Sequence, residues 1–294
     1  MTTRSNSTRA VFAVAAALAI TSFQVANSRA DDAKADKSQY WLFNPTPDGA
    51  LRDFAADRPA KSYGPTTIDA GRVQIELEAA NFTYLKLDGV RTQTFVGPNP
   101  TARIGLTSNV ELQLNWAPYV NVRTKFADGT TDNASSGSDF FARTKINIWG
   151  NEGGRTALAI MPYVKAGTAS ESIGGNRATE AGVIVPFTVD LQNNVSLTLN
   201  TEWDHLKNSA DSSYHSQYVN TIGISAPLVK DVTVTGELWS QINVDPAGTS
   251  RQYSFDTAVA WMARPNLQLD VGANFGLNKE TPAFQVYTGI TRRF

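Results

Sequence analysis

Cysteine is absent from the 294 residues of the chain, and histidine occurs only twice. The lack of cysteine excludes a disulfide framework, thiolate catalysis and cysteine metal sites. The 26 basic and 27 acidic residues leave a formal net charge of −1, which does not favour nucleic acid as a partner. After residue 20 there is also no apolar run near the roughly 20 residues that a membrane-spanning helix needs.

The first thirty residues have the pattern of a secretory signal peptide. Arg4 and Arg9 form a basic start, Ala10 to Ile20 is an unbroken apolar run, and Ser28-Arg29-Ala30 offers small residues at a cleavage site. A membrane anchor needs a longer apolar run. We therefore predict residues 1–30 as a cleaved signal peptide, residues 31–71 as an irregular periplasmic or lumenal segment, and residues 72–294 as the folded body.

From Arg72 onward, apolar and polar residues alternate with a period of two. In VELQLNW, residues 110–116, the apolar residues share one face, and Glu111, Gln113 and Asn115 share the other. The same phrase returns as NVSLTLNTEW, DVTVTGELW and NLQLDVGANF, and each copy follows a short polar corner. This pattern indicates antiparallel strands joined in sequence by hairpin turns.

Counting these segments predicts twelve strands. Connections after the even-numbered strands are short, whereas those after the first, third, fifth and seventh are longer, as in ADGTTDNASSGSD. The expected strands begin near residues 72, 99, 110, 139, 155, 178, 195, 213, 231, 251, 266 and 283.

Strand length and the character of the two faces separate a soluble sandwich or barrel from a membrane barrel. Soluble strands average about five or six residues, but most segments here reach the roughly 9 to 11 residues that a tilted membrane-spanning strand needs. The face opposite the apolar one carries charged and amide side chains, which suits a wet lumen. We predict an all-β, antiparallel up-and-down transmembrane β-barrel in the outer membrane of a Gram-negative bacterium.

The chain ends on TGITRRF, without a polar tail. Phe294, Ile290 and Val286 fall on one face of the expected last strand. A terminal Phe that closes an amphipathic strand resembles the signal by which the barrel assembly machinery inserts such proteins, although Arg292 departs from the usual apolar pattern. Phe294 and Ile290 are therefore predicted as an assembly signal, with outer-membrane lipid and this machinery as partners.

Four stretches carry a family resemblance. They are LFNPTPDGALRD, DRPAKSYGPTTIDAGRVQIELE, PTARIGLTSNVELQLNW and LQLDVGANFGLNKETPAFQVYTGITRRF. Together they resemble the outer-membrane transporter-like family labelled as a meta-pathway of phenol degradation, over about Leu42 to Phe294. The resemblance implies a barrel that passes small molecules, with no catalytic residues to carry over. Ala60 departs from the family, which often has an acidic residue after Asp57-Arg58-Pro59.

Catalysis and metal binding have few candidate residues. His205 and His215 flank DHLKNSADSSYH, where a serine could pair with a histidine or where Asp204 and both histidines could hold a metal. These are common residue types in surface loops. The glycine-rich GNEGG and SIGGN lack the context of a phosphate loop and read as turns. The sequence therefore predicts no enzyme, no catalytic residues, no metal site and no cofactor.

Charged residues of inward parity are predicted to line the pore. One acidic set lies at a shared level and comprises Glu78, Glu180, Glu202, Glu237 and Asp256, with Asp270 slightly lower. The inward bases Arg103, Arg143 and Lys145 lie across the barrel. Opposed arcs of charge would orient dipolar solutes, and the acidic excess would favour cations. The alternative is that these charges pair within the lumen and pack it.

Two functions follow from this architecture. Barrels of about eight strands are filled by side chains and those of 16 to 18 hold open pores, so twelve strands favour a narrow channel or transporter for small solutes. The family resemblance implies aromatic compounds as one class of solute. The alternative is a structural or interaction barrel whose lumen is plugged, for which residues 31–71 could supply the plug.

Overall fold

The computed structural model describes residues 36–294, so the predicted signal peptide lies outside the described residues. Three short 3-10 helices are present in this part, η1 (Asp48–Ala50), η2 (Glu171–Ile173) and η3 (Gln192–Asn194). The strands are β1 (Val73–Leu87), β2 (Val90–Val96), β3 (Asn99–Gly105), β4 (Val110–Asn115), β5 (Val120–Lys125), β6 (Thr131–Ser136), β7 (Phe140–Trp149), β8 (Thr156–Ala166), β9 (Glu180–Asp190), β10 (Ser196–Lys207), β11 (Tyr214–Val229), β12 (Val232–Asp245), β13 (Gly248–Arg264), β14 (Leu267–Gly276) and β15 (Phe284–Arg293).

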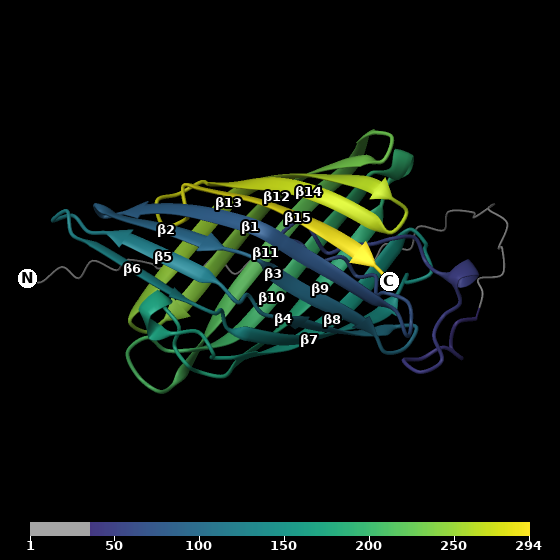
Figure 1. Cartoon of the computed structure of the whole chain (residues 1–294), viewed down its shortest axis with the longest axis horizontal. Coiled ribbons are helices and arrows are strands. Elements are labelled where there is room, and N and C mark those ends of the chain that lie inside the picture. Colours follow the sequence, from purple (N-terminus) through teal and green to yellow (C-terminus); the bar gives the residue numbers. More distant parts are fainter. Residues whose placement is uncertain (1–35) are drawn as a thin grey trace, which may run out of the picture. The chain divides into compact units, whose positions relative to one another are not determined.

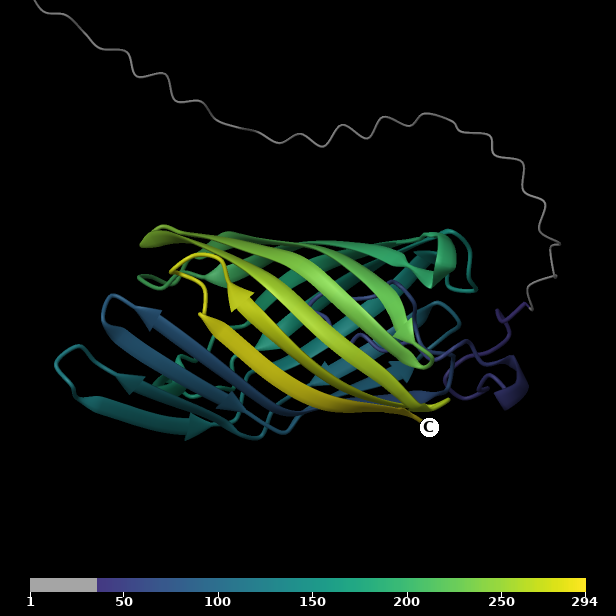
Figure 2. The same cartoon turned by 90° about the horizontal axis from the view of Figure 1, so that it is seen from above.

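The strands form one antiparallel sheet that closes into a barrel (Figures 1 and 2). From β7 to β15, neighbours in the chain are neighbours in the sheet, and β15 returns to pair with β1 from Gln74↔Arg293 to Tyr84↔Phe284. Twelve strands complete the circle, which confirms the predicted all-β barrel.

Three of the twelve spanning strands are broken at one level of the wall. Each consists of two pieces, β2 with β3, β4 with β5, and β6 with β7. The breaks contain Pro98, Pro118 and Gly137, and β1 carries a bulge at Ala79 beside them. A proline cannot donate to the ladder, and a bulge bends its strand. The pieces β2, β5 and β6 therefore extend the sheet beyond the closed barrel, next to β1. They are seen at the left of Figure 1.

Two of the predicted long connections were wrong for this reason. The first strand ends in a two-residue turn, Asp88-Gly89, with both residues at positive φ, and residues 90–96 pair with β1. Six of the 13 residues of ADGTTDNASSGSD are likewise strand, because Thr131–Ser136 pair with β5. The glycine and proline residues at the breaks are typical of loops. The sequence therefore indicated a loop where the strand continues a few residues later.

The two faces of the wall have inverted polarity relative to a soluble protein. Along β14, Val271 and Phe275 are 53% and 45% exposed, whereas Asp270 and Asn274 are each 5% exposed. A water-soluble barrel would bury the apolar set. The outer face is therefore an apolar band, and the inner face holds the polar residues, as in barrels that cross a membrane.

The two ends of the barrel also differ. One end, called the turn end, carries the short connections between β3 and β4, β7 and β8, β9 and β10, β11 and β12, and β13 and β14. Residues 36–51 lie at the turn end, where the Leu42 amide donates to the Leu106 carbonyl. The opposite end, called the loop end, carries the longer 167–179 and 277–283 connections. No helix within residues 36–294 is long and apolar enough to cross a membrane.

Candidate functional site in the barrel lumen

Residues 52–68, here called the lumenal segment, cross the inside of the barrel. Its backbone amides donate to Glu76 of β1, Glu111 of β4, Asn200 of β10 and Glu237 of β12. By sheet order β1 and β10 are six strands apart, as are β4 and β12. The segment therefore contacts opposite walls, and its own backbone donors are satisfied by inward carboxylates and amides.

Asp57 joins the segment to the basic side of the lumen. Its carboxylate lies 2.6 Å from Nζ of Lys145 and 3.5 Å from a guanidinium nitrogen of Arg103, and it accepts a hydrogen bond from Gln113 at 2.7 Å. Burial alone would raise the pKa of Asp57, but the two cations and these hydrogen bonds hold its pKa below the ordinary value. Asp57 is therefore charged at neutral pH and neutralises part of the basic arc.

Arg58 and Lys61 join the same segment to the acidic side. Arg58 lies 2.7 Å from Asp270 and 3.3 Å from Glu78. Its guanidinium lies against the backbone of β15, where a Cβ on Gly289 would come within 2.5 Å of it. Only glycine leaves room there for the side chain of Arg58.

Lys61 reaches β13 and β12, three and four strands away from β1 when counted through the β15 seam. Its ammonium lies 3.2 Å from Asp256, donates to Ser254 at 2.8 Å and sits 4.1 Å from the centre of the Trp239 ring. Burial lowers the pKa of Lys61, and the neighbouring Asp256 offsets part of that effect. The Lys61 amide and the Ser62 hydroxyl both donate to Glu237.

The charges of the segment are thus complementary to those of the wall. The acid of Asp57-Arg58-Pro59 contacts the basic arc, and the following bases contact the acidic arc. The segment bridges inward bases and inward acids of the wall with charges of opposite sign. Unpaired charges in such a site would cost several kcal/mol each, so the pairing fixes where each part of the segment lies.

The nine predicted pore-lining residues all lie on the inner face, in different surroundings. Glu78, Arg103, Lys145, Glu237, Asp256 and Asp270 contact the lumenal segment. Arg143 lies over the Phe141 and Tyr163 rings. Glu180 lies 2.7 Å from Lys165, and Glu202 lies between Asn200 and Asp204 on the inner side of β10. Their role in conduction stays a prediction.

Sequence reasoning did not select Glu76 and Glu111, which bind both Arg103 and the segment. Arg103 lies 2.8 Å from Glu76 and 2.9 Å from Glu111. The alternation of polar and apolar residues placed Glu111 on the polar face, and this pattern could have identified it as an inward residue. The predicted acidic residues were chosen because they share one level along the barrel. Glu76 and Glu111 were therefore missed, because they lie nearer the turn end.

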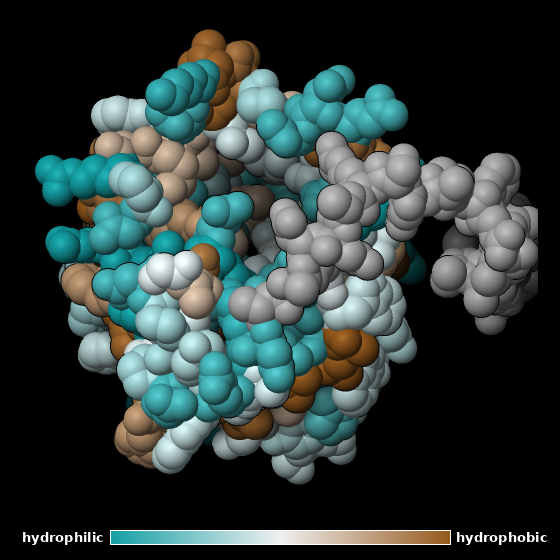
Figure 3. Space-filling model, turned by 90° about the vertical axis from the view of Figure 1, so that its right-hand side faces the viewer, coloured by the Kyte–Doolittle hydropathy of each residue, from teal (hydrophilic) through white to brown (hydrophobic). Residues whose placement is uncertain are grey.

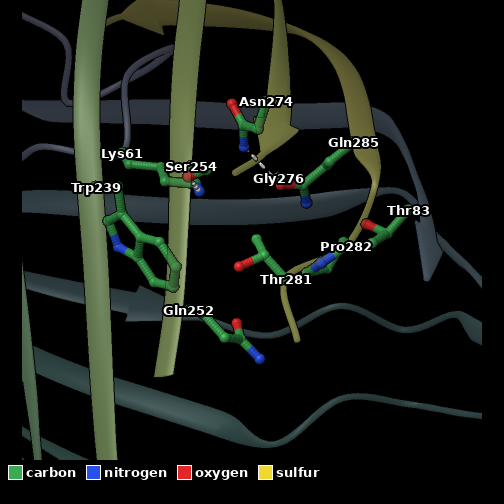
Figure 4. Close-up of a pocket in the computed structure, with 10 residues that line it drawn as sticks. All are labelled: Lys61, Thr83, Trp239, Gln252, Ser254, Asn274, Gly276, Thr281, Pro282 and Gln285. Atoms are coloured by element: carbon green, nitrogen blue, oxygen red, sulfur yellow. Dashed lines mark hydrogen bonds between the residues drawn. The ribbon is translucent and has the colours of Figure 1, made fainter. Parts of the chain in front are cut away.

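Two cavities lie on the loop-end side of the segment. One of about 220 Å³ is lined by Lys61, Trp239 and neutral polar side chains, among them Gln252, Asn274 and Gln285 (Figure 4). The other, of about 320 Å³, is lined by five residues of the segment between Asp57 and Tyr63, together with wall residues that include Asn115 and Arg143. At the turn end, hydrophilic side chains dominate, and hydrophobic ones lie mainly toward the periphery (Figure 3).

The histidines are not brought together. His205 stacks on Tyr214 at 4.7 Å on the outer face, whereas His215 is buried inside and contacts Asn208 at 2.9 Å. Within residues 36–294 no group of three or more histidines and acids is placed to hold a metal ion. The combined site considered from the sequence would need both rings on one face.

The predicted assembly residues lie on the outer face of the last strand. Ile290 pairs with Leu77 and Leu269. The Phe294 amide donates to the Val73 carbonyl at 2.8 Å, and its ring is exposed with Arg292 over it. This placement has the parity that the sequence predicted, and recognition by an assembly machinery stays a prediction.

The family model described as "Putative MetA-pathway of phenol degradation" matches residues 56–294. The chain belongs to this family. The match begins one residue before Asp57-Arg58-Pro59, so the family's region includes the residues that bridge the two arcs. No curated protein matches the sequence.

Solved structures similar to this family member are other barrels. The NanC porin shares 7% identity, covers 75% of this chain and 98% of its own, and has a TM-score of 0.48. The β domain of the Bordetella autotransporter BrkA shares 8% identity, covers 76% and 99%, and has a TM-score of 0.47. The translocator domain of NalP from Neisseria meningitidis shares 11% identity, covers 76% and 88%, and has a TM-score of 0.45.

Proposed function

We propose that the protein is an outer-membrane channel for small solutes that is closed by its lumenal segment and conducts when residues 52–68 are displaced. The observation that carries this proposal is the combination of an apolar outer band with a charged inner wall crossed by one chain segment. Both the segment and the wall are hydrophilic, so water can replace the segment's contacts when it leaves. A packed apolar core would have no such alternative.

A plugged structural or interaction barrel is the second candidate. It is favoured by the density of bonds between segment and wall, since the amides of Asp57, Arg58, Lys61, Tyr63 and Ile68 all have wall acceptors. The two functions differ in whether the segment ever leaves.

A reversible cross-link tests this difference. The chain has no cysteine, so Ser62→Cys with Glu237→Cys places the only two thiols at a contact between segment and wall. A short reducible thiol cross-linker should abolish single-channel conductance in a planar bilayer, and dithiothreitol should restore it. The control is Thr188→Cys with Thr198→Cys, whose hydroxyls lie 3.1 Å apart on neighbouring wall strands. That cross-link should leave conductance unchanged.

Each other outcome has a distinct meaning. Conductance that persists in the cross-linked Ser62–Glu237 variant would show that solutes pass beside a stationary segment, and displacement would be refuted. An absence of conductance before and after reduction, in a barrel that is folded and inserted, would favour the plugged barrel.

For the solute class, we propose small single-ring compounds with polar substituents. The cavity of about 220 Å³ offers the Trp239 ring and several amide side chains, and apolar cavities of about 150 Å³ in proteins hold benzene. The family description names phenol degradation. In a liposome permeation assay, phenol should enter faster relative to glycerol through the native protein than through Trp239→Leu. Equal ratios for both proteins would contradict this assignment.

A further inference from the structure

A basic patch covers the outer face of the sheet extension at the loop end. Lys86, Arg91 and Lys125 stand directly opposite one another on β1, β2 and β5. Two residues closer to the barrel, Tyr84, Gln93 and Arg123 form the next row. Because paired residues share a face and faces alternate along a strand, both rows point to the same side.

That side is the outside of the barrel. Tyr84 stacks on Phe284 of β15 at 5.6 Å, and Phe284 belongs to the exposed apolar set. The next residue of β15, Gln285, donates into the lumen, to Asn81. The patch is therefore separate from the lumenal site, although β1 contributes to both.

The four cations have no partner within residues 36–294. The structure gives Lys86, Arg91, Arg123 and Lys125 no ion pair and no side-chain hydrogen bond. Like charges directly opposite one another destabilise a sheet, so the row of three carries an electrostatic cost that nothing in the described chain offsets. A depression of about 400 Å³ lies between them, lined by Tyr84, Arg91, Gln93, Arg123 and Lys125.

Aromatic rings lie on the barrel side of the patch. Phe82 and Phe95 are opposite each other in the row below Tyr84, and Tyr119 lies 6.3 Å from Phe95. Aromatic side chains on the outer face of a barrel settle at the level of lipid headgroups. The cations beyond them then stand where lipid phosphates lie, and guanidinium groups bind phosphate in a bidentate manner.

We propose that this patch binds the phosphate of an anionic lipid headgroup in the leaflet at the loop end, with the acyl chains along the Phe82–Phe95 row. The inference rests on the proposed membrane location, but not on conduction. Phosphate supplies the counter-charge that the row of cations lacks, and the aromatic row distinguishes a lipid from free phosphate.

The test uses the purified full chain in neutral detergent and pyrene-labelled phosphatidic acid, whose headgroup is a phosphate monoester. Binding is measured as energy transfer from tryptophan to pyrene. Removing a cation near an anionic lipid surface weakens binding about fivefold, so Arg91→Gln/Arg123→Gln/Lys125→Gln should bind about a hundredfold more weakly. The matched control is Arg155→Gln/Lys230→Gln/Arg264→Gln, which removes three exposed cations at the turn end and should bind normally.

Two results would overturn the proposal. One is an equal loss in both triple variants, which would reduce the effect to net charge. The other is full displacement of the lipid by inorganic phosphate in the low millimolar range, which would leave a phosphate site without lipid. Labelled phosphatidylcholine should show no difference between the variants. Both variants should conduct like the native chain, so a failed lipid assay and a failed conductance assay are separate results.

Discussion

Replacing Asp57 by Asn should loosen the lumenal segment. The substitution keeps the size of the side chain but removes the charge that lies 2.6 Å from Lys145 and 3.5 Å from Arg103. Among residues 36–294, Lys145 would then keep only Glu111 as an ion-pair partner, at 3.6 Å. The amide could also turn a donor toward the ammonium, so the closest contact would become unfavourable.

The size of the effect follows from the burial of the pair. Removing one partner of a buried ion pair costs about 3–5 kcal/mol. The lower figure corresponds to about a 150-fold increase in the population with the segment released. Glu76 still holds the Asp57 and Arg58 amides, at 3.0 and 3.1 Å, so the segment should remain mostly in place at neutral pH.

Trypsin cleavage after Lys61 reports that population, because proteolysis of a rapidly opening segment tracks its open fraction. Asp57→Asn should raise the cleavage rate by about two orders of magnitude and increase the open probability in a bilayer. The matched control is Asp53→Asn, an exposed acid in the same segment with no side-chain partner in the described chain. If both variants are cleaved at the native rate while the barrel stays folded, the ion pair does not hold the segment.

Three further outcomes are expected. Because the pKa of Asp57 is lowered in the folded protein, the contribution of Asp57 to docking of the segment is present above about pH 4 and is lost as pH falls through the lowered pKa. The open probability of the channel should rise in this pH range. The Asp57→Asn variant should not show this rise. Gly289→Ala should displace the Arg58 guanidinium and raise tryptic cleavage, whereas Gly236→Ala, whose Cβ would make an ordinary contact with the Phe255 ring at 4.0 Å, should not. Glu202→Gln with Glu237→Gln should lower the cation preference of open channels, measured as reversal potential in a salt gradient; an unchanged potential would leave these acids with a structural role only.

The strand pattern was predictable because apolar and polar residues alternate within each strand. The sequence of a single strand therefore indicates which residues face outward and which face the lumen. Most of the expected strand starts fall within three residues of those observed, and the inward charges were assigned from parity alone. The broken strands were harder. Gly97-Pro98 and Pro118 have the local chemistry of loops, and only pairing with neighbouring strands makes their flanking residues extended.

The lumenal segment was not predictable at the level of contacts. Residues 31–71 have no apolar period, so no face could be assigned to them. Asp57, Arg58 and Lys61 acquire their roles from residues up to 212 positions away in the chain, as in the pair of Arg58 with Asp270. Complementarity between a short charged motif and two arcs becomes visible only when the circle of strands is known.

The position of the segment immediately before β1 has a consequence for the order of folding. The seam between β1 and β15 is the last join in the circle, since it links the first strand to the last. Arg58 contacts both sides of that seam, through Glu78 on β1 and Asp270 on β14. Contacts so distant in sequence form slowly, and a segment enclosed by the closing seam never has to be threaded through a finished ring. In this chain the lumenal segment is synthesised before the strands of the barrel. It can therefore serve as a core around which β15 pairs with β1.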